Sequence, residues 1–471
     1  MSKIPSYDVL VIGSGAAGFS AVEAARAQEA SVCLVEAGRL GGECPNDACV
    51  PSKALLKAAQ VYRQAQHARE FGVQLGQVSF DFSEIMRYRQ SVVNAITGDG
   101  ERGARYEKIL KSMKVEVKFG KASFVDDHIV EVGASQVQAR SVVIATGSVD
   151  FIPPIPGLDS VKFLGSADAM KLKRQPKAIA IIGGGPVGCE LATFFALIGT
   201  RVVLLQSAPM VLHREDEEIS KLARQALEGL KIELFTNASV VEVVNGGGGV
   251  YGLKVDVAGN RSMHAVEQVL VATGKRACTK GLAVEEAGIR LGKRGEIETN
   301  KEQKTNVPNI FAAGDVAGGM MFTHTAHHEG WVAGTNAALV AKKKRSTRLK
   351  SDERVVPRCT FVVPEVASVG LTQAEAQQAF KRVLVGRADV SSLGRSVTDN
   401  ARFGLLKIVA HPKTRKVLGG HMMGERAGEV IHEIALAIHL GATIDKLATL
   451  IHAYPTYSEA VVSAAATAQF E

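Results

Sequence analysis

The stretch "DVLVIGSGAAGFSAVEAARAQEASVCLVE" (8–36) begins with a continuous apolar run, which predicts a strand buried on both faces. A glycine-rich turn follows, then an alanine-rich helical segment and a second apolar run that ends at Glu36. This order is typical of a βαβ unit, which needs about thirty residues. The same order recurs in "KAIAIIGGGPVGCELATFFALIGTRVVLLQ" (177–206). The sequence therefore predicts two dinucleotide-binding folds.

Both units carry the pattern GxGxxG at the turn between strand and helix. The first glycine permits a tight turn, the second lets the backbone approach a pyrophosphate, and the third packs the helix on the strand. The N-terminus of the following helix favours negative charge. A glycine-rich turn can serve packing alone, but a strand before it and a helix after it form the context that phosphate binding requires. The predicted binding glycines are Gly13, Gly15 and Gly18 in the first unit, and Gly183, Gly185 and Gly188 in the second.

The residues at the strand ends distinguish the two expected ligands. Glu36 can accept hydrogen bonds from a ribose 2′-hydroxyl group. The second unit has Gln206 at that position, so the carboxylate that would repel a 2′-phosphate is missing. His213 and Arg214 follow and could reach such a phosphate. This favours NADPH over NADH, although Gln206 could serve either nucleotide and the basic pair could be ordinary surface.

The rest of the chain predicts a crossing between domains and a different C-terminal part. "SVVIATGSVDFIPPIPG" (141–157) and "QVLVATGKRACTKGL" (268–282) are apolar strands that close in Ala-Thr-Gly, and prolines after the first exclude a further central strand. "VPNIFAAGDVAGG" (307–319) predicts a buried strand ending at Asp315. Later segments indicate antiparallel strands and an amphipathic helix over 429–442. We expect an α/β protein with two Rossmann-like domains and a C-terminal α+β domain, divided into 1–150 with 276–346, 151–275, and 347–471.

Charge and hydropathy exclude several classes of function. The net charge is +8, but six positive charges lie in "AKKKRSTRLK" (341–350), which leaves +2 for the remainder. We interpret this run as a solvated linker, with docking to an acidic partner as the alternative. Nucleic-acid binding would be indicated by a basic surface interleaved with aromatic residues, and the sequence shows no such pattern. No apolar run is long enough to span a membrane. The segment "MSKIPSYDVLVIGSG" lacks the features of a secretion signal, so we expect a cytoplasmic protein.

Two cysteines lie five positions apart in "GGECPNDACVPSK" (41–53). In a regular helix, residues at this spacing have Cα atoms roughly 8–9 Å apart, whereas a disulfide needs less than about 7 Å. The segment from Cys44 to Cys49 must therefore leave helical geometry to form a bond, which Pro45 and Pro51 make plausible. A zinc site would want a second pair of ligands at short spacing. We favour a redox pair over a metal site or a structural disulfide.

These motifs, together with "AAGDVAGG" and "AYPTYSE", occur in an order that resembles the flavin-dependent pyridine nucleotide–disulfide oxidoreductases from end to end. The resemblance is greatest to the dihydrolipoamide dehydrogenase-like and mercuric reductase-like branch. It implies FAD on the first glycine motif, NAD(P)H on the second, and a homodimer formed through the C-terminal domain. It implies that Asp315 holds the ribityl chain of the flavin. Further cofactor-binding residues implied by the resemblance are Gly42, Gly120, Ala122, Thr146, Gly147, Ser148, Gly274, Met321, Phe322, Thr323 and His324.

The resemblance also assigns roles to the cysteines. Cys49 would exchange electrons with the flavin, and Cys44 would be the outer thiol that attacks the acceptor. Attack requires a thiolate, so a positive charge nearby should lower the thiol pKa. Lys53 is the cation that the family pattern implies, paired with an acid at Glu190.

The chain departs from the family near its C-terminus. Disulfide reductases of the family carry a histidine base before Pro-Thr, whereas "HAYPTYSE" (452–459) has Tyr454 there. The reference pKa of tyrosine is about 10, against about 6.5 for histidine. Tyr454 is therefore better suited to be a proton donor, a hydrogen-bond partner or a pocket wall. Glu459 stands where the family has the glutamate that orients the base, and His452 is either a substitute base or a structural histidine.

We expect an enzyme that moves electrons from NAD(P)H through FAD to the cysteine pair, and on to a small disulfide or a soft electrophile. One alternative is a dihydrolipoamide dehydrogenase, which the missing histidine disfavours. Another is a mercuric reductase-like enzyme, although "SAAATAQFE" (463–471) lacks the vicinal cysteines that mercuric reductases carry. The third is a redox sensor that holds FAD and turns over slowly.

Overall fold

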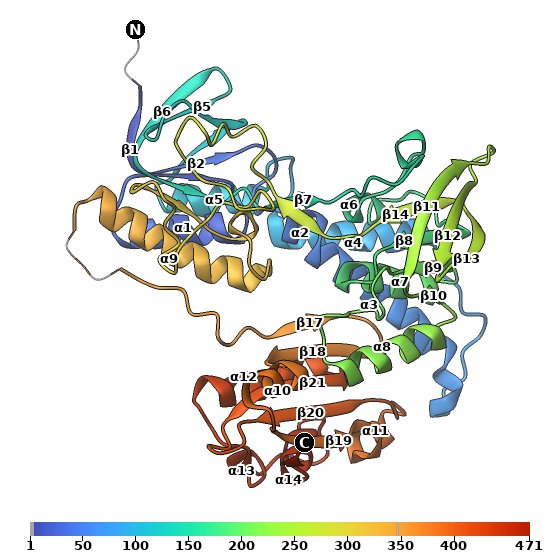
Figure 1. Ribbon diagram of the computed structural model, residues 1–471. Coiled ribbons are helices and arrows are strands. Elements are labelled where there is room, and N and C mark those ends of the chain that lie inside the picture. Colours follow the sequence, from blue (N-terminus) through green and yellow to red (C-terminus); the bar gives the residue numbers. More distant parts are fainter. Residues whose placement is uncertain (1–3, 345, 347) are drawn as a thin grey trace. The chain divides into compact units, whose positions relative to one another are not determined.

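The computed structural model describes residues 4–344, 346 and 348–471, and the chain divides into two compact units. The first unit comprises Met1–Ala54, Met86–Phe151 and Gly274–Glu353. The second comprises Leu55–Ile85, Ile152–Thr273 and Arg354–Glu471. Figure 1 shows the elements of both, coloured along the chain. The finer division into three domains stays a prediction.

The first unit is built on a mainly parallel sheet in the order β3-β2-β1-β6, with β16 also paired to β6. The continuous apolar run of β1 is buried on both faces, because Val9 and Val11 join one core while Leu10 and Ile12 join the other. The predicted βαβ unit is thereby confirmed. The strands are β1 (Ser6–Ile12), β2 (Val32–Glu36), β3 (Glu116–Phe119), β4 (Ala122–Phe124), β5 (Ile129–Val132), β6 (Ser135–Ile144) and β16 (Ile310–Ala312), with β7 (Ser148–Asp150) and β15 (Lys275–Ala277) as a separate ribbon.

Two helices of the first unit pack closely through small residues. A Cβ added to Gly330 of α9 would lie 2.1 Å from the carbonyl oxygen of Ala17 in α1, and one on Gly334 would lie 2.2 Å from that of Ala21. Backbone contact at this distance fixes α9 against α1. The helices are α1 (Ala16–Ala27), α2 (Glu43–Asp47), α5 (Ala104–Ser112), the 3-10 turn η3 (Asp315–Ala317) and α9 (Thr323–Ala341), while α3 (Cys49–Gln66) and α4 (Phe82–Thr97) each extend into the second unit.

The strand predicted to end at Asp315 ends earlier, and that prediction was wrong. β16 stops at Ala312, and Asp315 begins η3. Gly314 has φ 78° and ψ −159°, a conformation open to glycine, and it turns the chain out of the sheet. Asp315 therefore lies in a turn beyond the strand.

The second unit contains a parallel sheet in the order β10-β9-β8-β14, which confirms the second predicted βαβ unit. A three-stranded antiparallel sheet, β11-β12-β13, belongs to the same unit. The elements are η1 (Ala68–Phe71), η2 (Leu158–Ser160), α6 (Ser166–Ala169), β8 (Ala178–Ile182), α7 (Pro186–Leu197), β9 (Arg201–Leu205), α8 (Glu217–Gly229), β10 (Glu233–Phe235), β11 (Ala238–Asn245), β12 (Tyr251–Val257), β13 (Asn260–Val266) and β14 (Gln268–Val271).

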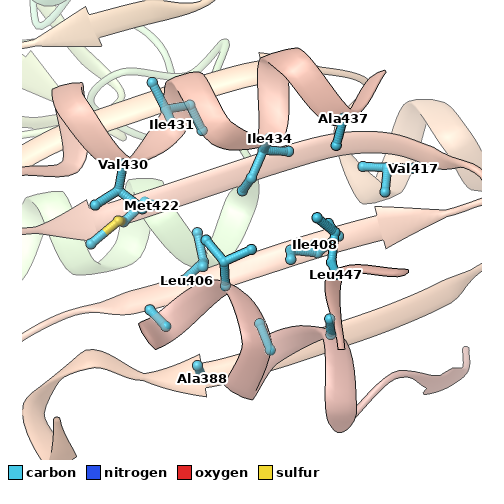
Figure 2. Packing of buried hydrophobic residues seen from close by; sticks show 14 of the residues in the cluster. Ala388, Leu406, Ile408, Val417, Met422, Val430, Ile431, Ile434, Ala437 and Leu447 are labelled. Carbon is cyan, nitrogen blue, oxygen red and sulfur yellow. The ribbon is translucent and has the colours of Figure 1, made fainter. Parts of the chain in front are cut away.

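A six-stranded sheet in the order β17-β18-β21-β20-β19-β22 follows, with antiparallel pairing throughout. Figure 2 shows α12 directing Val430, Ile431 and Ile434 toward Met422 and Leu406 of this sheet. The predicted helix over 429–442 is thus α12. The elements are β17 (Arg358–Thr360), β18 (Glu365–Gly370), α10 (Gln373–Phe380), β19 (Leu384–Asp389), η4 (Val390–Ser392), α11 (Gly394–Thr398), β20 (Leu405–Ala410), β21 (Val417–Gly424), α12 (Ala427–His439), α13 (Ile444–Leu447), α14 (Glu459–Ala466) and β22 (Gln469–Phe470).

A buried ion pair joins this sheet to the start of α8. The ammonium group of Lys407 on β20 donates to both carboxylate oxygens of Asp216 at 2.9 and 3.0 Å, and to Glu218 at 2.7 Å. The side chains of Lys407 and Asp216 are each only 2% exposed. Asp216 also caps α8 by accepting from the backbone N–H of Glu218. The carboxylate of Asp216 therefore caps α8 and also pairs with Lys407 of the sheet.

No helix in the described part of the chain combines the length and the apolar character that a membrane span requires. The basic run 341–350 follows α9, and its residues Arg345 and Thr347 lie outside the described residues.

Candidate active site

The first glycine turn lies between β1 and α1 and has no room for side chains at two of its three glycines. Gly13 has φ 98°, and a Cβ there would lie 2.3 Å from the carbonyl oxygen of Ala145. A Cβ on Gly18 would lie 1.8 Å from the carbonyl oxygen of Gly13. Gly15 caps α1, and the nearest atom to a Cβ there is the Cα atom of Gly42, at 3.9 Å. The free space thus lies at the helix N-terminus, where a pyrophosphate is favoured.

Glu36, at the end of β2, holds the same turn together. Its Oε2 atom accepts from the backbone N–H of Ser14 at 2.9 Å and from the Ser14 hydroxyl at 2.5 Å. Its Oε1 atom accepts from the N–H of Gly38 at 2.7 Å. The N–H of Gly120, just beyond β3, donates to the Glu36 carbonyl at 2.9 Å, and Ala122 lies buried at the start of β4. The predicted ribose-binding carboxylate is therefore at the sheet edge that carries the glycine turn.

The loop that leads to the cysteines packs directly on this turn. A Cβ on Gly42 would lie 2.5 Å from the Cα atom of Gly15. The N–H of Gly41 donates to the Ser14 hydroxyl at 3.2 Å. The buried amide of Asn46 donates to the carbonyls of Leu40 and Gly42 at 3.0 and 2.8 Å. Asn46, which the sequence did not single out, thereby fixes the loop before Cys44.

The two cysteines lie on different helices, as their spacing required. α2 ends at Asp47, α3 begins at Cys49, and Ala48 between them has φ −135° and ψ −93°, which is not helical. Proline clashes with the carbonyl four residues before it, so Pro51 excludes a continuous helix through Asp47. The structure presents both cysteines as thiols, joined by a side-chain hydrogen bond.

The groups around the thiols have opposite effects on the pKa of Cys44. The hydrogen bond with Cys49 is the largest influence and, with burial, raises the pKa of Cys44. A hydrogen bond from Thr323 and the charge of Lys53 lower that pKa, which is the direction predicted for Lys53. On balance the pKa of Cys44 is raised, not lowered as predicted, because the hydrogen bond with Cys49 and burial outweigh Thr323 and Lys53.

The N-terminus of α9 reaches the thiol pair. The Thr323 hydroxyl lies 3.6 Å from the sulfur of Cys49, and Thr323 is the first residue of the helix. A helix N-terminus carries partial positive charge, which favours a thiolate. Phe322 caps this helix, Met321 before it has φ 52°, and the rings of Phe322 and His324 stack with centroids 5.4 Å apart. Thr323, one of the predicted cofactor-binding residues, is therefore placed against a cysteine.

An ion cluster beside Cys44 was not predicted. Lys275 on β15 pairs with Glu43, the residue before Cys44, and with Asp150 on β7 at 2.9 Å. Burial lowers the pKa of Lys275, but the two carboxylates outweigh burial and raise it. This cluster ties the first turn of α2 to the β7–β15 ribbon. Acid and lysine are 232 positions apart, so no spacing in the sequence could reveal the pair.

Asp315 lies beside the stretch 146–148, a contact that the sequence did not predict. The hydroxyl of Ser148 donates to Asp315 Oδ2 at 2.5 Å, and the hydroxyl of Thr146 donates to the carbonyl of Cys278 at 2.8 Å. A Cβ on Gly147 or Gly274 would meet no atom within 4 Å, and both glycines have positive φ. The chain therefore leaves room for an added atom at Gly147, next to the residue that contacts Asp315.

The second glycine turn repeats the first. Gly183 has φ 115°, and a Cβ there would lie 2.3 Å from the Ala272 carbonyl oxygen. A Cβ on Gly188 would lie 1.9 Å from the Gly183 carbonyl oxygen, whereas one on Gly185, the cap of α7, would meet nothing within 4 Å. The same open helix N-terminus results, so each of the two turns suits a dinucleotide.

Gln206 closes the second turn. Its Oε1 atom accepts from the N–H of Gly184 at 3.0 Å, and its Nε2 atom lies 3.3 Å from Nδ1 of His213. His213 and Arg214 are both exposed after β9. The predicted basic pair is therefore adjacent to the residue that replaces the carboxylate.

Glu190 is buried in α7 and accepts from the backbone N–H of Phe361 at 3.0 Å, after β17. Lys53 belongs to the first unit and Glu190 to the second, so their pairing stays a prediction.

The C-terminal candidates His452 and Glu459 contact different groups. Both ring nitrogens of His452 face acceptors, the Glu433 carboxylate at 3.0 Å and the Leu450 carbonyl at 3.2 Å. Tyr454 is 78% exposed. Glu459 accepts from the N–H of Thr456 at 3.0 Å, at the start of α14. Contacts at both ring nitrogens fix the orientation of His452, which favours the structural interpretation.

Comparison with known proteins agrees with this architecture. Residues 7–330 match the family model "Pyridine nucleotide-disulphide oxidoreductase", and residues 356–465 match that family's dimerisation domain. Mercuric reductase from Staphylococcus aureus is 34% identical over 98% of this chain and 82% of its own length. Dihydrolipoyl dehydrogenase from Chlorobaculum parvum is 35% identical over 98% and 97%.

Among solved structures, the Cu(II) complex of the HOCl-induced flavoprotein disulfide reductase RclA from Escherichia coli superposes with a TM-score of 0.85. It is 27% identical and covers 98% of this chain and 99% of its own. The predicted fold class is confirmed, and the dimerisation domain supports a homodimer. The chain thus belongs to the pyridine nucleotide–disulphide oxidoreductases, flavin-dependent enzymes that use FAD and NAD(P)H.

Proposed function

We propose that this enzyme passes electrons from NAD(P)H through FAD to the Cys44–Cys49 pair, and from there to a small disulfide. The observation that carries the proposal is the placement of two hydrogen-bonded thiols beside Lys53 and the N-terminus of α9. FAD, when bound, accepts hydride from the nicotinamide and returns the electrons to the protein. Gly13, Gly15 and Glu36 would hold it, and Asp315 would hold its ribityl chain.

The thiol pair can reduce a disulfide without another reductant. The Cys44 thiolate attacks one sulfur of the acceptor, the acceptor S–S bond breaks, and a mixed disulfide forms as the first thiol leaves. The Cys49 thiolate then attacks Cys44, the mixed disulfide breaks, and the second thiol leaves. Two electrons pass to the acceptor, the two protons of the thiols pass with them, and the Cys44–Cys49 disulfide forms.

The charges of the site support this order of attack. Lys53 and Thr323 favour the thiolate form of Cys44, against the opposing effects of burial and of the hydrogen bond with Cys49. We assign Glu190 as the partner of Lys53, as the resemblance implies. For the second nucleotide, Gln206 with His213 and Arg214 supports NADPH over NADH.

The acid–base group remains the point at which this chain departs from its relatives. We assign Tyr454 as a proton donor or pocket wall contributed across a homodimer, because it is largely exposed in the single chain. Glu459 orients the turn before α14, and His452 is the less suitable base. We place the enzyme in the cytoplasm, with neither nucleic acid nor membrane as a partner.

A soft metal ion is the second candidate acceptor. Two of the relatives bear on it by name, a mercuric reductase and a flavoprotein reductase in complex with Cu(II). A thiolate pair is a suitable first ligand for such ions. The described residues contain no group of three or more His, Cys, Asp or Glu side chains that could hold a metal. A metal acceptor would therefore meet the thiol pair itself.

Anaerobic titration of the holoenzyme with NADPH and with NADH tests the proposal. We expect a long-wavelength absorbance band from a thiolate beside oxidised flavin, and we expect Cys49→Ser to abolish it while Cys44→Ser retains it. A panel of hydroxyethyl disulfide, lipoamide, Hg(II) and Cu(II) then identifies the acceptor. Oxidation of NADPH without any of these acceptors being reduced would favour the redox-sensor alternative, and dihydrolipoamide oxidation at typical enzyme rates would favour the dehydrogenase.

A further inference from the structure

A buried carboxyl group lies against the turn that carries Asp315. Glu329 on α9 is 6% exposed, and its Oε2 atom accepts from the backbone N–H of Gly314 at 2.6 Å. Gly314 directly precedes Asp315 and has positive φ, so the direction in which Asp315 leaves the turn depends on how Gly314 is held. Neither the thiol chemistry nor the glycine turns account for this carboxyl group.

A second carboxyl group meets the first. The side chain of Glu329 is hydrogen-bonded to that of Glu353. Two carboxylates offer only acceptors, so a hydrogen bond between them requires one proton. The hydroxyl of Ser351 donates to Oε1 of Glu353 at 2.9 Å. A proton between the two carboxyl groups would satisfy this contact, and each member accepts from one further donor.

The segment 349–353 is brought to Glu329 by contacts along α9. The buried Asn336 donates to the carbonyl of Leu349 at 2.9 Å and accepts from the Leu349 N–H at 2.9 Å. Nearer the helix N-terminus, Nε2 of His328 accepts from the N–H of Asp352 at 3.2 Å. Glu353 thus arrives beside Glu329 at the end of a segment fastened at two other points.

The groups that surround Glu329 favour its protonated form. Burial is the largest influence and raises the pKa of Glu329 to about 7, the Gly314 hydrogen bond lowers it, and Glu353 and Asp315 raise it. His328 faces Asp352, whose backbone N–H donates to its Nε2 atom. The residues of α1 that contact the next turns of α9 are Ala17 and Ala21, which carry no charge.

We propose that Glu329 is a positioning residue for FAD, and that the proton it shares with Glu353 fixes the Gly314–Asp315 turn in the conformation that binds the cofactor. Loss of this proton places two carboxylates in contact beside a third, Asp315, which drives the segment 349–353 from α9 and loosens the turn. FAD affinity then falls as the pH rises above neutrality. The inference rests on the role that the proposed function gives to Asp315.

The test is the release of FAD from diluted holoenzyme, followed by the fluorescence of the freed cofactor from about pH 6 to about pH 8.5. In the wild type we expect the FAD dissociation constant to rise above neutrality by up to tenfold per pH unit, the limit for linkage to a single proton. Glu329→Gln and Glu353→Gln should remove this slope, because an amide supplies both a donor and an acceptor without a titrating proton. Glu298→Gln is the matched control at an exposed position of the same unit and should keep the slope.

Infrared difference spectroscopy gives a second readout. At neutral pH, the spectrum of the wild type minus that of either variant of the pair should contain the carbonyl band of a protonated carboxylic acid, and the spectrum of the wild type minus that of Glu298→Gln should not. If Glu329→Gln does not fold, the inference is tested by the pH slope of Glu353→Gln and by the carbonyl band of the wild type. A wild-type slope that persists in a folded variant of the pair, or a neutral wild type without the band, overturns the inference.

Asp315→Ala separates failure of this inference from failure of the proposed function. If this variant binds FAD as tightly as the wild type, the role given to Asp315 is wrong. If it binds FAD weakly while Glu329→Gln keeps the wild-type pH slope, the role given to the shared proton is wrong.

Discussion

Glu36 and Gln206 close equivalent turns in the two βαβ units, and they differ by one negative charge. Glu36 accepts from the N–H of Ser14 at 2.9 Å, and Gln206 accepts from the N–H of Gly184 at 3.0 Å. The acceptor oxygen that closes the turn is therefore preserved where the charge is not. Closing the turn does not require a carboxylate, so the charge at this position is available to discriminate between ligands.

Gln206→Glu should shift nucleotide preference toward NADH. The new carboxylate can still accept from Gly184, but it would repel a 2′-phosphate beside His213. We expect the ratio of kcat/KM for NADPH to that for NADH to fall at least about tenfold, which corresponds to about 1.4 kcal/mol. Gln378→Glu, exposed on α10, is the control. An unchanged ratio would mean that Gln206 does not contact the ribose.

Lys53→Met should slow the reaction of the reduced enzyme with iodoacetamide at neutral pH. The charge of Lys53 lowers the pKa of Cys44, so its removal leaves less thiolate. We expect the alkylation rate to fall by about threefold to tenfold, the range for loss of one nearby charge at a partly exposed thiol. Lys57→Met, exposed one turn further along α3, should react as the wild type does. Equal rates for both variants would contradict the predicted role.

Lys407→Met should destabilise the protein by about 3–5 kcal/mol, because it leaves the carboxylate of Asp216 buried without its cation. Adding Asp216→Asn should recover most of the loss, since asparagine can still cap α8. Denaturant unfolding of both variants measures this coupling. A double variant as unstable as the single one would show that the loss comes from packing and not from the unpaired charge.

Stability should also fall in acid through Glu218. The hydrogen bond from Arg387 is the largest influence and, with Lys407, lowers the pKa of Glu218 to about 2. A carboxylate with a lowered pKa stabilises the fold above its ordinary pKa and loses that contribution as the pH falls toward 2. Glu218→Gln should therefore flatten the decline in thermal midpoint between about pH 5 and about pH 3. A decline as steep as in the wild type would mean that groups other than Glu218 cause the loss of stability in acid.

Tyr454→His should raise dihydrolipoamide oxidation by about a hundredfold, the lower end of what a positioned base contributes. Histidine can take a proton at neutral pH, whereas tyrosine is almost entirely protonated there. His452→Gln should leave this rate unchanged, because His452 is already bound to Glu433 and Leu450. A wild type that oxidises dihydrolipoamide as fast as Tyr454→His would remove the argument from the missing base.

Features that depend on neighbours in sequence were predictable. The two βαβ units, their glycines and the break between Cys44 and Cys49 follow from apolar runs, absent side chains and proline geometry, all of which act within a few residues. The end of β16 was not predictable. Gly314 leaves the sheet with its N–H bonded to Glu329, fifteen residues later on another element.

The ion pairs of the protein also could not be predicted from the sequence. Glu43 and Lys275, like Asp216 and Lys407, are brought together only by the completed fold. The family resemblance named Lys53 as the cation near the thiols, but not the cluster that surrounds Lys275. The direction of the Cys44 pKa depends on the balance of Cys49 and burial against Thr323 and Lys53, which no spacing rule predicts.

The contacts of Asp216 with both α8 and Lys407 limit which segments of this chain can be exchanged with those of relatives. If the C-terminal third were exchanged for that of a relative without a lysine at position 407, the carboxylate of Asp216 would be left buried without its cation. A chimera of this kind would therefore need a matching change at position 216.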